Sequence, residues 1–113
     1  MSTSHGTLEN EIMNAVWTLE EELSSKNGIS VSDIVNYINR NGTTRAYTTV
    51  KTVMDRLAEK NLLVRTKYGK KFCYNSTSSR RESANVAIRR LAGQYFNNDV
   101  RMLMKALEKE CLV

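Results

Sequence analysis

Residues 46–61 read AYTTVKTVMDRLAEKN, and residues 63–75 read LVRTKYGKKFCYN. In the first stretch, apolar residues recur at helical spacing, which predicts an amphipathic helix near 46–60. In the second, two short runs rich in β-branched and aromatic residues flank KYGK, whose glycine suits a tight turn. A helix followed directly by a basic hairpin is therefore expected. Asp55 and Glu59 are the only acidic residues in the two stretches, and this balance favours a negatively charged partner.

The predicted helix has one apolar face that is expected to be buried. The apolar positions are Ala46, Val50, Val53, Met54 and Leu57. Asn61 suits the end of the helix, because asparagine tolerates the left-handed conformation that often ends helices.

Two more helices are predicted before this pair. Apolar residues at helical spacing indicate a first helix near 7–24, with Thr7 as its N-cap. A second helix is expected to end near Asn41, and either Ser30 or Ser32 can cap its start. Three helices followed by a hairpin are the layout of a winged helix-turn-helix domain.

Two further helices are predicted after the hairpin. The sequence STSSRRE has good capping chemistry and begins a helix that runs to about Tyr95. An asparagine pair then breaks the pattern, and a last helix follows near 98–110. The expected fold class is mainly α with a small β-hairpin. It comprises a winged helix-turn-helix DNA-binding domain at 1–76 and a C-terminal helical dimerisation region at 77–113.

The length of 113 residues suits one ordinary domain, or a small domain with an appendage. No apolar run approaches the ~20 residues that span a bilayer, and the N-terminus lacks the basic and apolar regions of a signal peptide. We therefore expect a cytoplasmic protein without membrane insertion.

Charge is distributed unevenly along the chain. Residues 1–39 carry one Lys/Arg and six Asp/Glu, a net charge of −5. Residues 40–90 carry thirteen Lys/Arg and three Asp/Glu, a net charge of +10, and residues 91–113 carry three of each. A positive excess this concentrated attracts polyanions. A basic face that is merely solvated is the alternative, and the helix and hairpin inside the basic segment favour nucleic acid.

The candidate DNA contacts lie on the polar face of the helix near 46–60 and on the basic hairpin at 65–73. Short hydroxyls and a lysine at the start of that face can approach base edges and phosphates closely. The hairpin can follow the phosphate backbone, which would make binding depend strongly on salt. The candidates from this pattern are Thr48, Thr49, Lys51, Thr52, Arg56, Arg65, Lys67, Lys70 and Lys71.

Three nearby residues have competing interpretations. Asp55 lies on the DNA face, where it can accept from a cytosine amino group or pair with Lys51 or Arg56, and we favour the ion pair. Phe72 and Tyr74 share one strand face, and we interpret them as packing residues rather than platforms on which bases stack.

The last two helices carry more apolar residues than a two-helix tail can cover by itself. This favours a partner surface, most simply a second copy of the chain. A symmetric dimer would place two recognition helices about one DNA turn apart, or a multiple of it, and read a palindrome. The alternative is that these helices fold back on the first helix of a monomer. The candidate dimerisation residues are Val86, Leu91, Tyr95, Phe96, Val100, Leu103, Met104 and Leu107.

Enzyme chemistry has little support in the sequence. His5 is the only histidine, and neither a glycine-rich phosphate loop nor a nucleophile elbow is present. We predict no enzymatic activity, no cofactor and no metal. Cys73 and Cys111 match no metal or redox motif. They are interpreted as reduced, semi-buried thiols, and a thiol- or metal-responsive regulator that uses both is an alternative.

Four segments together resemble a known family. They are LENEIMNAVW (8–17), ISVSDIVNYI (29–38), AYTTVKTVMDRLAEKNLLVR (46–65) and GKKFCYN (69–75). In this order they resemble the penicillinase and methicillin-resistance repressor family, which includes the copper-responsive CopY-type repressors. The resemblance is close from residue 8 to residue 75 and extends to the C-terminal helices in pattern only.

The resemblance implies a winged-helix domain, a helical dimerisation tail and repression by occupying a dyad operator, typically of the TACA/TGTA kind. It maps the family's recognition-helix contacts onto Tyr47, Thr48, Thr49, Lys51 and Thr52, and its wing contacts onto Lys67–Lys71. Arg45 stands where the family often has tryptophan, and it adds a candidate phosphate contact.

The family's induction mechanisms do not carry over. Its β-lactam-responsive members are cleaved at an Asn-Phe bond, whereas this chain has Phe96-Asn97 and no Asn-Phe. Its copper-responsive members have a C-terminal cysteine cluster, whereas only Cys111 is present here. A membrane sensor-protease that acts as antirepressor is an alternative partner, and the sequence identifies neither the regulated genes nor the inducing signal.

We predict a homodimeric, sequence-specific transcriptional repressor that binds a palindromic operator in double-stranded DNA. The alternative, from a different functional class, is a winged-helix domain that serves as a protein–protein interaction module. Such a module would bind nucleic acid weakly, in a salt-labile way and without a preferred sequence.

Overall fold

The computed structural model describes residues 5–23 and 27–111. The chain forms two compact units, Met1–Ser78 and Ser79–Val113. In the described residues, no helix combines the length and the apolar character needed to cross a membrane.

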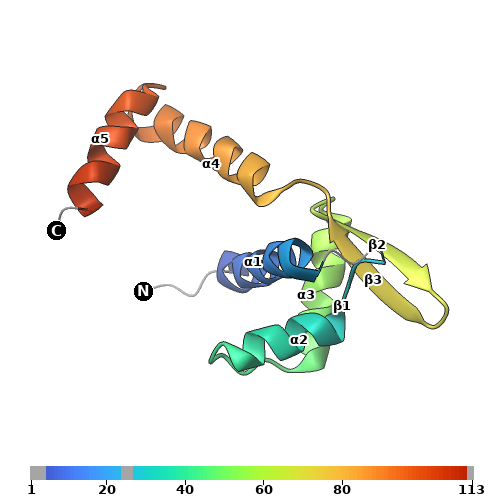
Figure 1. Ribbon diagram of the computed structural model, residues 1–113. Coiled ribbons are helices and arrows are strands. Elements are labelled where there is room, and N and C mark those ends of the chain that lie inside the picture. Colours follow the sequence, from blue (N-terminus) through green and yellow to red (C-terminus); the bar gives the residue numbers. More distant parts are fainter. Residues whose placement is uncertain (1–4, 24–26, 112–113) are drawn as a thin grey trace. The chain divides into compact units, whose positions relative to one another are not determined.

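The first unit is a winged helix, and the fold class predicted from sequence is confirmed. Three helices precede a hairpin that projects beyond them (Figure 1). A short first strand joins the hairpin, so the antiparallel sheet has the order β1-β3-β2. The elements are α1 (His5–Leu23), β1 (Ile29–Ser30), α2 (Val31–Arg40), α3 (Tyr47–Glu59), β2 (Leu63–Tyr68) and β3 (Lys71–Ser76).

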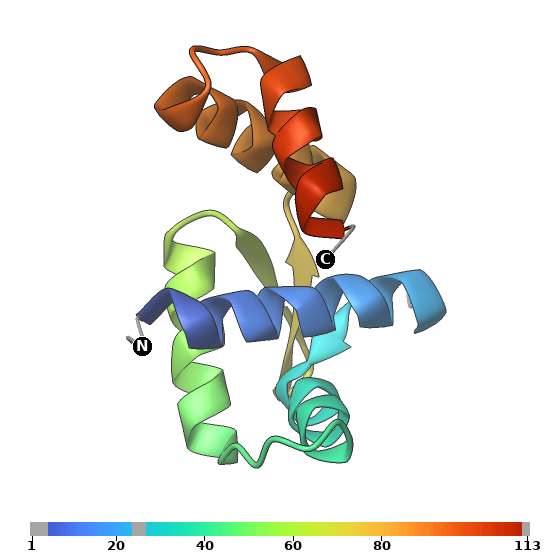
Figure 2. The same cartoon turned by 90° about the vertical axis from the view of Figure 1, so that its left-hand side faces the viewer.

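One hydrophobic core joins α1, α2, α3 and the sheet. Helix α1 lies across α3 and the sheet (Figure 2) and contacts both, as well as α2. The core includes Ile12, Val16, Ile34, Val50, Val53, Met54, Leu57, Leu63 and Tyr74. The apolar face predicted for α3 is therefore buried, with one exception. Ala46 is exposed, because it is the N-cap of α3 and lies outside the helical turns.

Local chemistry explains where most of these elements begin and end. The Ser30 side chain accepts from the backbone N–H of Asp33, and the Asp33 carboxylate accepts from the backbone N–H of Ser30, which forms a capping box. Asn61, directly after the α3 cap, has a φ of 64°. Gly69 has the same φ and occupies the first position of a two-residue hairpin loop, as a type II′ turn requires.

Two further details of the first unit differ from the sequence prediction. Thr7 is not an N-cap, because α1 begins at His5 and Thr7 lies in its first turn. The strand β1 was not predicted. It pairs Ile29 with Tyr74, and Gly28 allows the close approach, since a Cβ there would lie 2.9 Å from the Tyr74 carbonyl oxygen.

The second unit consists of α4 (Arg80–Tyr95) and α5 (Val100–Cys111). Ser79 and Glu82 form the capping box predicted at the start of α4. The predicted break follows α4, where both residues of the Asn97–Asn98 pair have positive φ. The last helix begins two residues later than position 98, because Asp99 caps it by accepting from the backbone N–H groups of Arg101 and Met102.

Candidate nucleic-acid interface

The solvent face of α3 carries short polar side chains. Thr48, Thr49, Thr52 and Arg56 are exposed, and the buried stripe on the opposite side holds them in that orientation. The Thr52 hydroxyl donates to the carbonyl oxygen of Thr48 at 2.9 Å, which leaves its oxygen available as an acceptor. These side chains line a shallow, open hollow. The surface suits close approach by a base edge or a phosphate.

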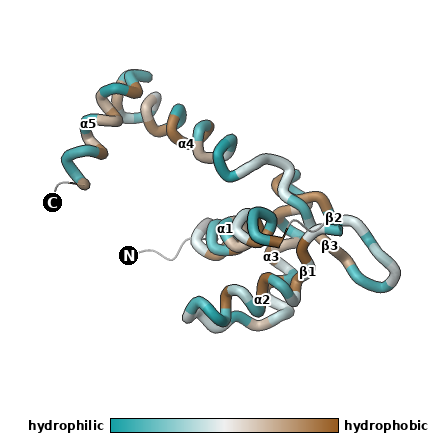
Figure 3. Tube along the Cα trace, viewed as in Figure 1, coloured by the Kyte–Doolittle hydropathy of each residue, from teal (hydrophilic) through white to brown (hydrophobic). Residues whose placement is uncertain are grey.

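The hairpin β2–β3, called the wing below, presents cations at its far end. Lys67, Lys70 and Lys71 are exposed, and none of the carboxylates that the structure describes pairs with them. The hydrophilic character of this end is visible in Figure 3. Ammonium groups without carboxylate partners are free to replace the counterions of a phosphate backbone.

A second hollow lies between the start of α2, the start of α3 and the wing. Its lining includes Ser30, Ser32, Lys51, Lys70 and Lys71. Backbone N–H groups at a helix start and several ammonium groups together suit a phosphate. The sequence does not predict that the start of α2 lines this hollow. The pattern Ser30-x-x-Asp33 marks the helix start in the sequence, but nothing in the sequence indicates that this start lies beside the wing.

Asp55 joins α3 to both long strands. Its Oδ2 accepts from Lys51 Nζ at 2.8 Å, and its Oδ1 accepts from Arg65 Nη1 at 3.0 Å and from Tyr74 Oη at 2.6 Å. Partial burial raises the pKa of Asp55, but the hydrogen bonds from Lys51, Tyr74 and Arg65 outweigh it and hold the pKa below its ordinary value. The ion pair with Lys51 is confirmed. The second cation is Arg65 of β2 and not Arg56.

Phe72 is half-buried against the core, and three cationic side chains lie around its ring. Arg65 Cζ lies 4.5 Å from the ring centroid, Lys67 Nζ 5.8 Å and Lys51 Nζ 5.9 Å. These distances fall within the range of cation–π attraction. Phe72 therefore is a packing residue, as expected, and it also gathers cations beside α3. Tyr74 is fully buried, as expected for a packing residue.

Arg45 is engaged within the protein. Its Nη2 lies 3.0 Å from Glu11 Oε1, and its backbone N–H donates to Asn39 Oδ1 at 3.0 Å. The guanidinium thus fastens the segment before α3 to α1. The other predicted residues of α3 and the wing lie in the same unit, and Tyr47, at the first position of α3, is half exposed.

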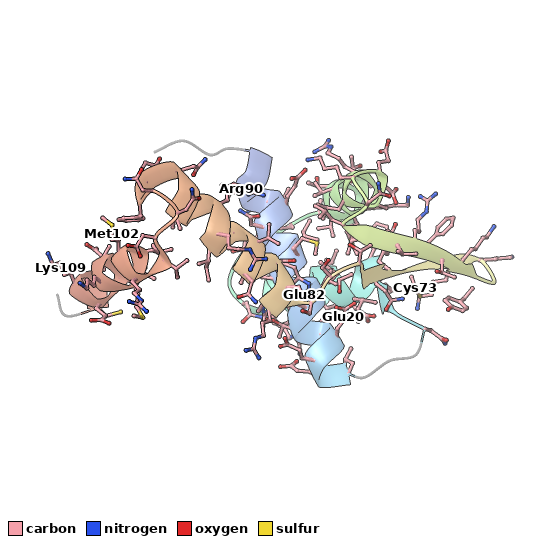
Figure 4. All side chains as sticks on the ribbon, turned by 90° about the horizontal axis from the view of Figure 1, so that it is seen from above. Glu20, Cys73, Glu82, Arg90, Met102 and Lys109 are labelled. Atoms are coloured by element: carbon pink, nitrogen blue, oxygen red, sulfur yellow. The ribbon has the colours of Figure 1, made fainter. Side chains whose placement is uncertain are left out.

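The predicted dimerisation residues lie in the second unit, and most are exposed. Leu103 is the exception, because it is only 3% exposed in the single chain, and Phe96 is half-buried. Ile88 and Met102 are exposed apolar residues that the prediction omitted. Met102 is labelled on α5 in Figure 4. Hydrophobic and hydrophilic residues are interspersed along α4 and α5 (Figure 3).

The two cysteines are free thiols, but the prediction that they are semi-buried is wrong for both. Cys73 is buried on β3, and Cys111 is exposed at the end of α5.

Comparison with known proteins assigns the chain to a family. A comparison with curated proteins gave no match. The family model described as penicillinase repressor matches residues 5–112, and so covers both structural units. The chain belongs to the penicillinase repressor family, a family of winged-helix, DNA-binding transcriptional repressors.

Proposed function

We propose that this chain represses transcription as a homodimer that occupies a dyad operator, with α3 in a major groove and the wing along neighbouring phosphates. One observation supports the DNA-contacting part most strongly. The exposed threonines of α3 and the lysines of the wing without carboxylate partners belong to the same compact unit. Such an arrangement can read bases and hold the backbone at the same time.

The roles proposed for individual residues follow from their chemistry. Thr48, Thr49 and Thr52 would approach base edges, because their side chains are short and exposed. Arg56 is exposed and pairs with none of the described carboxylates, so it is available for a guanine edge or a phosphate. Tyr47 stands at the start of α3 and would contact the phosphate backbone of the DNA.

The dimeric part of the proposal is supported by the second unit. Its exposed apolar residues are 39–73% accessible in the single chain, and they are Val86, Ile88, Leu91, Tyr95, Val100, Met102, Met104 and Leu107. So many exposed apolar side chains on two short helices favour burial against a second copy. Leu103 is already buried, so we leave it out of the proposed contact. Two linked winged helices would then read two half-sites, for which the family resemblance suggests the TACA/TGTA pattern.

Capture of genomic DNA tests the proposal against its main alternative. The full chain is mixed with sheared DNA from its own genome at about 0.15 M salt, and the bound fragments are sequenced. The proposal predicts a small number of enriched positions that share a dyad with half-sites about one helical turn apart, or a multiple of it. A protein–protein interaction module predicts even coverage, with binding that disappears as salt rises. Even coverage would contradict the proposal.

A further inference from the structure

Asp55 is the one described carboxylate that joins α3 to the wing. It receives donors from three elements: Lys51 of α3, Arg65 of β2 and Tyr74 of β3. The side chains of Lys51 and Arg65 are 40% and 41% exposed, so both cations reach the surface that would meet DNA. Asp55 is itself 26% exposed and stands beside them.

The surroundings of Asp55 contain more positive than negative charge. Lys51, Arg65 and Lys67 converge on the ring of Phe72, at 4.5–5.9 Å from its centroid. Three like charges gathered around one ring repel one another, and the ring offsets only part of that repulsion. The ionised carboxylate holds two of the three cations by direct hydrogen bonds, which are stronger than contacts with the ring.

We propose that Asp55 is a positioning residue that fixes Lys51 and Arg65 between α3 and the wing and keeps them from binding phosphates indiscriminately. The inference rests on the proposed function, because it assumes that this surface meets DNA. It adds a specificity role for a negatively charged group within a basic interface.

The physical reason lies in the origin of non-specific affinity. A protein on a wrong sequence gains mainly from cations that release counterions from the backbone. A cation that is already paired with Asp55 releases fewer counterions from the DNA. The carboxylate itself is repelled by nearby phosphates. On a correct sequence, contacts to bases compensate for this loss. Asp55 therefore lowers binding to wrong DNA more than binding to the right DNA, which is how an unfavourable element creates specificity.

Binding to a scrambled duplex measures this effect directly. The full chain and its Asp55→Asn variant are titrated into a labelled 30-base-pair duplex of scrambled sequence at several salt concentrations. The amide keeps the shape and can still accept from Tyr74, but it carries no charge. We expect the salt dependence to steepen by about one phosphate equivalent and the affinity to rise roughly fivefold to tenfold at 0.1 M salt. Unchanged or weaker binding by the variant would overturn the proposal.

Two control variants separate charge from packing. Asp55→Glu restores the carboxylate and should return the salt dependence toward that of the wild type. Tyr74→Phe removes a hydrogen bond to the same carboxylate but changes no charge, so its salt dependence should equal that of the wild type. If Tyr74→Phe steepens the salt dependence as much as Asp55→Asn does, the effect is one of packing and the proposal is wrong.

A pair of exposed cations provides a test that does not depend on how Asp55→Asn folds. Arg65 is paired with Asp55, whereas Lys70 pairs with none of the described carboxylates. Arg65→Gln should therefore reduce the salt dependence clearly less than Lys70→Gln, which should reduce it by about one phosphate equivalent. Equal reductions would contradict the proposal.

A second duplex, carrying a TACA/TGTA dyad, distinguishes failure of this inference from failure of the proposed function. A wild-type chain that binds the dyad and the scrambled duplex equally would count against sequence-specific repression at this dyad. The Asp55 comparison would keep its meaning, because it is made on the scrambled duplex.

Discussion

Tyr74 is the residue on which the core and the proposed interface meet. Its ring is fully buried, and its hydroxyl donates to Asp55 at 2.6 Å. Burial and the neighbouring carboxylate raise the pKa of this hydroxyl, so it remains a donor at any physiological pH. A single side chain thus anchors β3 in the core and orients the acid that holds Lys51 and Arg65.

Replacing Tyr74 by phenylalanine should lower the free energy of unfolding by about 1–2 kcal/mol, because a hydrogen bond to a charged acceptor is lost inside the protein. Urea denaturation followed by circular dichroism measures the change. Tyr68→Phe is the matched control, since Tyr68 is exposed near the tip of the wing and should leave stability unchanged. Equal stability of Tyr74→Phe and the wild type would show that the bond contributes nothing.

Asp55 should contribute to stability in a pH-dependent way. Its pKa is lowered in the folded state, so its contribution is present above the unfolded pKa of about 3.9 and is lost as pH falls through the lower folded value. The wild type should therefore exceed Asp55→Asn in stability at pH 6, and the difference should shrink below about pH 4. Urea midpoints at a series of pH values measure it, and a difference that stays constant down to pH 3 would contradict this account.

The residues of α3 could be predicted individually, but the Asp55 cluster could not. Helical periodicity alone places Val50 inside and Thr48 outside. The contacts of Asp55 with Arg65 and Tyr74 depend on how the wing packs on α3 and on the pairing of Arg65 with Tyr74 across β2 and β3. Neither the packing of the wing on α3 nor the pairing of the two strands has a local signal in the sequence.

At the scale of elements, the start of α4 was predictable because a capping sequence marks it, and Ser79 with Glu82 forms the capping box. At the start of α2 the sequence left two serines as alternative caps, and the structure has Ser30 in a capping box with Asp33. The strand β1 was missed for a physical reason. Two residues are too few to show alternation, and they are a strand only because the edge of β3 lies beside them.

The start of α2 offers a direct test, because the sequence left Ser30 and Ser32 as alternative caps. Ser30→Ala should lower the free energy of unfolding by about 1 kcal/mol, since the α2 helix loses its side-chain cap. Ser32→Ala should change it by less than about 0.5 kcal/mol, because Ser32 is exposed within the first turn. Thermal or urea unfolding of the two variants measures both values, and a larger effect at Ser32 would contradict the observed cap.

At the scale of the whole molecule, the structure shows how part of the uneven charge is compensated. Acidic residues of α1 hold basic or polar groups of later elements: Glu9 pairs with Lys60, Glu11 with Arg45, and Glu20, labelled in Figure 4, accepts from the backbone and hydroxyl of Ser76. The acidic first segment thus neutralises part of the basic one. The lysines at the far end of the wing have no such partner among the described carboxylates.

Dimerisation through the second unit is the whole-molecule prediction. The double variant Met104→Glu/Leu107→Glu places charge on two exposed apolar positions of α5 and should shift the chain from dimer to monomer in sedimentation equilibrium. Gln94→Glu adds a charge at an exposed polar position of α4 and should remain dimeric. A monomeric wild type, or a double variant that remains dimeric, would contradict the proposed contact.

The central claim is that α3 reads the operator, and the variant Thr48→Ala/Lys51→Ala/Thr52→Ala tests it most directly. Fluorescence anisotropy compares its affinity for the dyad duplex with that of the variant Lys109→Ala. Lys109, which is labelled in Figure 4, lies on α5, so this control loses one positive charge away from α3. We predict that the triple variant loses about tenfold or more in affinity for the dyad, and much less for a scrambled duplex, because each lost base contact costs about 1–3 kcal/mol. Full affinity of the triple variant for the dyad would contradict the account.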